Sequence, residues 1–130
     1  MKQSKKMIQI VLVIIVLSSF FLVKYLVDVK QYQTTVSNMT FSDIDIRGIP
    51  NGVYEGECNV GYISAKVSVS IKDGVITDLK LMEHKNEKGA TAEKIIDDIL
   101  DKQTVNVDAV SGATNSSKVI KKAVENALRR

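Results

Sequence analysis

The stretch AKVSVSIKDGVITDLKLM, residues 65–82, decides the fold of this chain of 130 residues. Its first half alternates apolar with polar side chains, the apolar ones being Ala65, Val67, Val69 and Ile71. A period of two predicts a strand with one buried face. Asp73-Gly74 then gives a tight-turn signal, and Val75 to Met82 predicts the returning strand of a hairpin.

Working outward from this hairpin, residues 53–60 predict a preceding strand that Gly56 interrupts. After the loop HKNEKG, residues 91–102 repeat apolar side chains at helical spacing, and Thr91 is the expected cap. The last segment predicts the clearest helix, with a stripe of Val119, Ile120, Ala123, Val124, Ala127 and Leu128. The expected fold is therefore a small α+β domain, an antiparallel sheet with helices on one face.

The N-terminal part of the chain predicts a membrane anchor. Residues 7–23 are apolar apart from three polar residues, and they span about 26 Å as a helix, near the lower limit for a bilayer core. Residues 24–27 extend this span to 7–27 if Lys24 snorkels to the head groups. No small-x-small site follows it, which favours an uncleaved anchor over a cleavable signal peptide.

The lysines of the basic tip, residues 1–6, place the N-terminus in the cytoplasm of a single-pass protein of the cell membrane. Residues 28–48 then predict a polar, aperiodic stalk, and residues 49–130 an extracytoplasmic domain.

Charge and residue usage exclude several classes of function. Residues 1–30 hold five lysines against one aspartate, whereas the remaining hundred hold 13 basic and 14 acidic residues. The basic excess therefore belongs to the N-terminus, and no nucleic-acid groove is expected. The single cysteine, Cys58, excludes an internal disulfide and predicts a buried strand residue, with a reactive thiol as the alternative. With His84 as the only histidine, neither a histidine metal cluster nor a Ser-His-Asp triad can form within one chain.

The stretch DAVSGATNSS, residues 108–117, gathers hydrogen-bonding side chains at the entrance of the last helix. Gly112 allows a tight turn, and Ser116 or Asn115 is the expected N-cap. The unpaired N–H groups and the dipole of a first helical turn favour an anion such as phosphate. On the residues alone, an ordinary capped helix remains the alternative.

The same stretch, continued as DAVSGATNSSKVIKKAVENAL, resembles the C-terminal signature of the FMN-binding domain family. That family includes the flavin subunits of the Rnf and sodium-translocating NADH:quinone oxidoreductase complexes and small exported flavoproteins. The segments PNGVYEGE, VSVSIKDGVITDLKLMEH and GATAEKIIDDIL are also similar to the family pattern, so the resemblance covers about residues 49–128.

The resemblance implies that a flavin transferase joins the FMN phosphate to the Thr114 hydroxyl, with FAD as donor. Asp108 would belong to the motif that the transferase recognises. The remaining attachment-side residues that the resemblance implies are Ser111, Gly112, Ala113, Ser116 and Ser117. The implied ring-side contacts are Glu83, His84, Gly89, Ala90 and Thr91, where HKNEKGAT lacks the proline that commonly precedes the glycine.

The resemblance thus implies a membrane-anchored electron carrier with covalent FMN, serving a membrane or surface redox partner rather than acting as a stand-alone enzyme. Two alternatives stay open at this point. One is an accessory binding or sensor module in which FMN is non-covalent or absent. The other is a subunit of a larger reductase complex.

Overall fold

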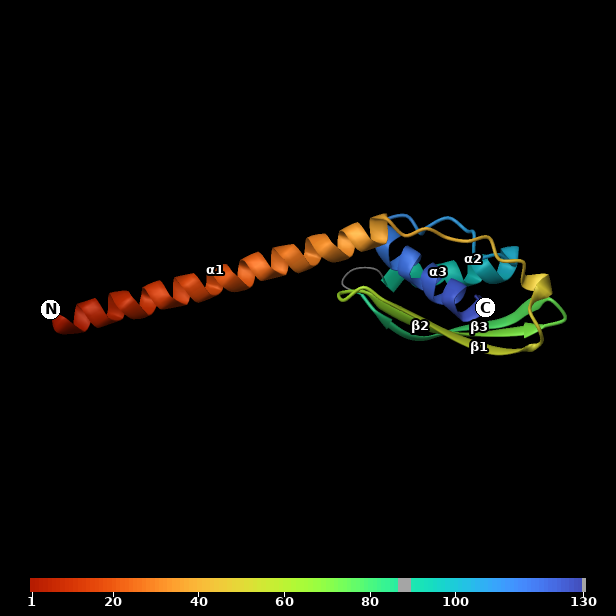
Figure 1. Ribbon diagram of the computed structural model, residues 1–130, viewed down its shortest axis with the longest axis horizontal. Helices are drawn as coiled ribbons and strands as arrows, with labels where there is room; N and C mark the ends of the chain where they lie inside the picture. Colours follow the sequence, from red (N-terminus) through yellow and green to blue (C-terminus); the bar gives the residue numbers. More distant parts are fainter. Residues whose placement is uncertain (87–89, 130) are drawn as a thin grey trace. The chain divides into compact units, whose positions relative to one another are not determined.

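The structure is a computed structural model that describes residues 1–86 and 90–129. It divides into two compact units, Met1–Tyr32 and Gln33–Arg130. Figure 1 shows the elements along the chain; η denotes a 3₁₀ helix. They are α1 (Lys2–Ser37), η1 (Ile46–Gly48), β1 (Gly52–Asn59), β2 (Ser64–Lys72), β3 (Val75–Lys85), η2 (Ala90–Lys94), α2 (Ile95–Lys102) and α3 (Thr114–Leu128).

The three strands form one antiparallel sheet in the order β1-β2-β3, which confirms the predicted antiparallel sheet. The alternating apolar side chains of β2, from Ala65 to Ile71, are all buried. At the β2–β3 turn, Asp73 has a φ of 53° and Gly74 a φ of 74°. Two successive positive values match the hairpin turn in which the strand twist is preserved.

Helices α2 and α3 cover one face of this sheet, as Figure 1 shows and as the α+β prediction requires. Helix α3 packs on β1 and β2, while α2 packs on β3. The buried apolar residues of α3 are those of the predicted stripe: Val119, Ile120, Ala123, Val124, Ala127 and Leu128.

The closest approach between helix and sheet occurs at Gly56 of β1. A Cβ atom added there would lie 2.1 Å from the carbonyl oxygen of Ala123 and 2.4 Å from the backbone nitrogen of Ala127. Real Cβ atoms do not come this close to a backbone atom. The backbone of α3 therefore rests directly on β1, and the glycine that interrupts the strand pattern is what permits this contact.

The helix predicted over residues 91–102 is shorter than expected. Residues 90–94 form η2, and α2 begins only at Ile95, after Lys94, which makes no side-chain cap bond. The prediction of Thr91 as the cap is therefore wrong. Ala92 and Ile95 are both fully buried, and the tighter 3₁₀ winding places residues three apart on one face.

At its other end, α2 is tied to the exposed edge of the sheet by Gln103. This residue adopts the left-handed conformation, with a φ of 53°. Its side-chain oxygen accepts from the Ile76 N–H at 2.7 Å, and its Nε2 donates to the carbonyls of Ile76 at 3.0 Å and Leu100 at 2.8 Å. One side chain thus satisfies both backbone groups of an edge-strand residue.

The segment predicted as an aperiodic stalk, residues 28–48, differs from that prediction. Helix α1 continues to Ser37, since no glycine or proline occurs before Gly48 to end it. Residues 36–42, which we name the strap, then lie along α3. Lys122 donates to the Thr40 carbonyl at 2.8 Å, and the Ser42 N–H donates to the carboxylate of Glu125 at 3.3 Å.

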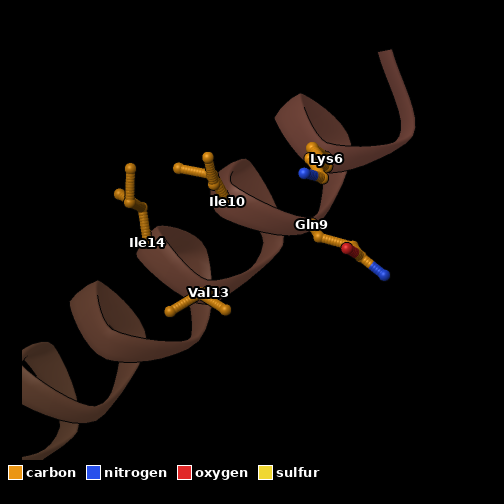
Figure 2. A pocket seen from close by; sticks show the side chains of 5 residues that line it. All are labelled: Lys6, Gln9, Ile10, Val13 and Ile14. Atoms are coloured by element: carbon orange, nitrogen blue, oxygen red, sulfur yellow. The ribbon is translucent and has the colours of Figure 1, made fainter. Parts of the chain in front are cut away.

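Helix α1 is long and apolar enough to cross a membrane. Its apolar side chains between Met7 and Val23 are all more than half exposed. Figure 2 shows a shallow hollow on this helix, lined by Lys6, Gln9, Ile10, Val13 and Ile14, whose side chains project outward from a single helix. An apolar surface of this kind suits contact with lipid rather than with water.

We expect Gly56→Ala to destabilise the domain by about 3 kcal/mol, because the added methyl group must displace the backbone of α3. Urea unfolding followed by circular dichroism measures this loss. Gly48→Ala is the matched control, since a Cβ atom at Gly48 meets nothing within 4 Å. Equal midpoints for the two variants would contradict the close packing.

Cys58 is 9% exposed on β1, which confirms the prediction of a buried strand residue. Burial raises the pKa of its thiol above the ordinary value of 9.0. The positive charge of Lys122 acts in the opposite direction, and the negative charge of Glu57 raises the pKa further. The unfolded chain therefore loses the thiol proton more readily than the folded one. Stability contributed by the neutral thiol is fully present below pH 9.0 and is lost as the pH rises from 9.0 through the raised pKa of the folded state.

It follows that the wild-type domain loses more stability than Cys58→Ala when the pH rises from neutral to above 9.0. Unfolding midpoints of both proteins at the two pH values test this. All other side chains are the same in both proteins, so the difference between the two losses reports the removal of the thiol. A difference of zero would show that the thiol is not desolvated.

Candidate functional site

The loop before α3 makes a sharp turn into the helix. Gly112 has a φ of 78°, and the Ala113 N–H donates to the Val110 carbonyl at 3.0 Å. A Cβ atom at Gly112 would meet nothing within 4 Å, so the glycine is needed for its backbone conformation and not for space. This confirms the predicted tight turn.

Helix α3 begins earlier than the expected cap. Its first residue is Thr114, and the preceding Ala113 makes no side-chain cap bond. The prediction of Ser116 or Asn115 as N-cap is therefore wrong, because the turn at Gly112 feeds the chain directly into the helix. Ser117 is fully buried instead, and its hydroxyl accepts from the Val110 N–H at 2.9 Å.

The outcome is an exposed hydroxyl at the positive end of a helix of 15 residues. Thr114, Gly112, Ser111 and Asp108 are all exposed, whereas Ala113 is buried. The N–H groups of a first helical turn lack intrahelical acceptors and point out of the helix with the dipole. A phosphate carried on the Thr114 oxygen would meet these groups.

Behind the loop, Lys121 forms the shortest side-chain bond of this region. Its Nζ donates to the Val107 carbonyl at 2.6 Å and lies 4.5 Å from the centre of the Phe41 ring. Burial lowers the pKa of Lys121, while Asp108 raises it and Lys118 lowers it further. The buried ammonium therefore links helix α3, the loop and the strap.

The residues expected on the ring side lie at the end of β3 and in η2. Glu83, Ala90 and Thr91 are exposed, and Gly89 lies outside the described residues. His84 differs from them, because its side chain is only 3% exposed. Since η2 packs against α3, the structure brings this group of residues and helix α3 to the same part of the domain.

The imidazole of His84 is held at one nitrogen only. Its Nδ1 lies 3.0 Å from Oε1 of Glu93 in η2. Its Nε2 is buried and has no hydrogen-bond partner among the residues that the structure describes. A buried polar atom without a partner is unfavourable, and a ligand that supplies one would remove the penalty. The site therefore fits a polar heterocycle in addition to a phosphate.

Sequence reasoning missed four residues here: Glu93, Phe41, Ser117 as a buried acceptor, and Lys121. The stripe of α3 marks Ile120 and Ala123 as buried, but nothing in the spacing distinguishes Lys121 from Lys122. Glu93 looks like a solvated charge at a helix start. Among residues 1–86 and 90–129, no group of three or more histidine, cysteine or carboxylate side chains is placed to hold a metal ion.

Comparison with known proteins gives one match. The family model described as FMN-binding domain matches residues 61–129, which is more than half of the chain. No curated protein and no solved structure matches the chain. The match includes the loop with Asp108, the turn at Gly112 and all of helix α3.

Proposed function

The chain belongs to the FMN-binding domain family, and from that premise we propose that it is a membrane-anchored flavoprotein that carries FMN covalently on Thr114 and transfers electrons. One observation carries the proposal. The Thr114 hydroxyl is exposed at the first residue of α3, where a helix N-terminus receives a phosphate best.

The attachment is a phosphoryl transfer with FAD as donor. The Thr114 oxygen attacks the phosphorus of the FMN half, forming a new P–O bond. The bond from that phosphorus to the bridging oxygen of the pyrophosphate breaks, AMP leaves, and the hydroxyl proton passes to solvent. No oxidant or reductant is consumed, and the product is a phosphodiester between Thr114 and FMN.

A flavin transferase needs an accessible sequence around the acceptor. Asp108, Ser111 and Gly112 are exposed on the same loop, which suits their proposed recognition by such an enzyme. Ser116 is buried in the first turn and Ser117 is bonded to Val110, so these two support the loop from behind. Their proposed part in binding the phosphate is therefore secondary to that of the helix N–H groups.

Bound FMN would supply reversible acceptance and donation of electrons, and the protein supplies its position and surroundings. We propose that a membrane or surface redox partner provides or accepts these electrons, and that the chain is a carrier rather than a stand-alone enzyme. Helix α1 would hold it in the membrane through residues 7–27. The lysines of residues 1–6 favour a cytoplasmic N-terminus and a domain outside the membrane.

On the ring side we propose His84 as the main contact, with Glu83, Ala90 and Thr91 around it. Glu93 orients the imidazole through Nδ1, which leaves Nε2 to meet a polar atom of the flavin. The same nitrogen is a donor or an acceptor according to the tautomer, so it suits either a carbonyl oxygen or an N–H group.

The mass of the full-length chain, produced together with a flavin transferase, tests the attachment. We expect a gain of one FMN less one water, absent in Thr114→Ala and retained in Thr114→Ser, because serine keeps an acceptor hydroxyl. Fluorescence in a denaturing gel gives a second readout, since only a covalent flavin survives denaturation. An unmodified wild-type chain under these conditions would rule out covalent attachment and favour an accessory module.

The ring-side proposal predicts that His84→Gln still gains the mass of FMN but shows altered flavin absorbance and fluorescence. The variant keeps the attachment site and changes only the group that faces the ring. Lys80→Gln, an exposed position on the same strand, is the matched control. Identical flavin spectra for His84→Gln and the wild type would remove His84 from the ring environment.

A further inference from the structure

Three lysines of α3 make bonds to backbone carbonyls, but only one of them reaches the attachment loop. Lys118 donates to Val36 at 3.4 Å and Lys122 donates to Thr40 at 2.8 Å, both in the strap. Lys121 donates to Val107, the residue next to Asp108 in the loop. The hydrogen bonds from these lysines to the strap and to the loop therefore come from different side chains.

The strap contacts Lys121 through the aromatic ring of Phe41. The Phe41 ring lies 4.5 Å from Nζ of Lys121 and 5.6 Å from Nζ of Lys122. A cation over an aromatic face is stabilised when water is excluded. Lys121 is 8% exposed, so the strap keeps its ammonium dry while allowing it one strong acceptor.

The bond to Val107 has the features of a strong constraint. It is short, charge-assisted and buried, and such bonds are stronger than those between neutral groups. The negative charge of Asp108 favours the charged form of the same ammonium, whereas the charge of Lys118 opposes it. The net effect is to fix the loop at Val107, seven residues before Thr114.

A second bond completes the support of the loop. The hydroxyl oxygen of Ser117 accepts a hydrogen bond from the Val110 N–H at 2.9 Å, and the Val110 carbonyl accepts one from the Ala113 N–H at 3.0 Å. Lys121 and Ser117 stand four residues apart on α3, on one face of the helix. The loop is thus fastened at two points to the helix that begins at its own end.

We propose that Lys121 is a positioning residue for flavin attachment: by fastening Val107 to α3 under the strap, it holds the loop that presents the Thr114 hydroxyl in one conformation. This rests on the proposed function, because attachment is the step that the fixed loop serves. A flexible loop would offer the acceptor in many geometries, and transfer is slow when the reacting atoms are misplaced.

Hydrogen exchange on the full-length chain in detergent tests the fastening without any flavin. Thr114→Val is the background, so that no cofactor can be attached. We expect Lys121→Met to speed exchange of the Val107, Val110 and Ala113 amides about tenfold, since a buried charged bond is lost. Lys122→Met is the matched control: it should speed exchange of Ser42, whose N–H is bonded to Glu125, and leave the loop unchanged.

The rate of FMN incorporation at saturating transferase tests the consequence. In the chain with Thr114 intact, we expect Lys121→Met to slow incorporation about tenfold more than Lys122→Met does, at similar melting temperatures. Suppose that the wild type gains FMN. If both variants then slow FMN incorporation equally, or if amide exchange in the loop is unchanged in Lys121→Met, the inference about Lys121 fails while the proposed function stands. If the wild type gains no FMN, the proposed function fails, and the exchange experiment still decides whether Lys121 fixes the loop.

Discussion

The contact between Gly56 and the backbone of α3 is the constraint on which the rest of this domain depends. With a distance of 2.1 Å between the carbonyl oxygen of Ala123 and the position of an added Cβ atom, no other residue fits at Gly56 without moving the helix. The contact sets how deeply α3 lies against β1, and thereby where Thr114 emerges at the start of the same helix. The Asn126 side chain adds a bond to the Glu57 carbonyl at 2.8 Å, beside the glycine.

Helix α3 combines an apolar face with buried charged side chains, and the two have different roles. The apolar face supplies the stability of the domain through packing on β1 and β2. Glu125 is fully buried and is paired with Lys122 at 3.0 Å and Arg129 at 3.8 Å. Such a network adds little net stability after desolvation, but it specifies where the strap lies. The strap is thus part of the domain fold although it precedes the residues that the family model matches.

The sequence allowed the sheet, the hairpin turn and the stripe of α3 to be predicted, because each rests on local periodicity or on a two-residue turn signal. The resemblance of its motif also indicated Thr114 as the attachment residue, and this role stays a prediction. The details that failed depend on tertiary context. The cap of α3 moved from Ser116 to Ala113 because the positive φ of Gly112 starts the helix early, and Thr91 lies inside a 3₁₀ turn that packing of Ala92 and Ile95 selects.

The contacts that hold the strap against α3 join residues that are distant in the chain. Lys118 and Lys122 each bond a residue 82 positions away, and Ser42 bonds Glu125 across 83 positions. Lys121 follows Ile120 and precedes Lys122, and these neighbours alone do not mark it as buried. Only the fold brings the Phe41 ring and the Val107 carbonyl, which both precede Lys121 in the chain by different distances, to the same ammonium. The motif proposed for attachment is therefore local in the sequence, whereas the contacts around its loop come from several parts of the domain.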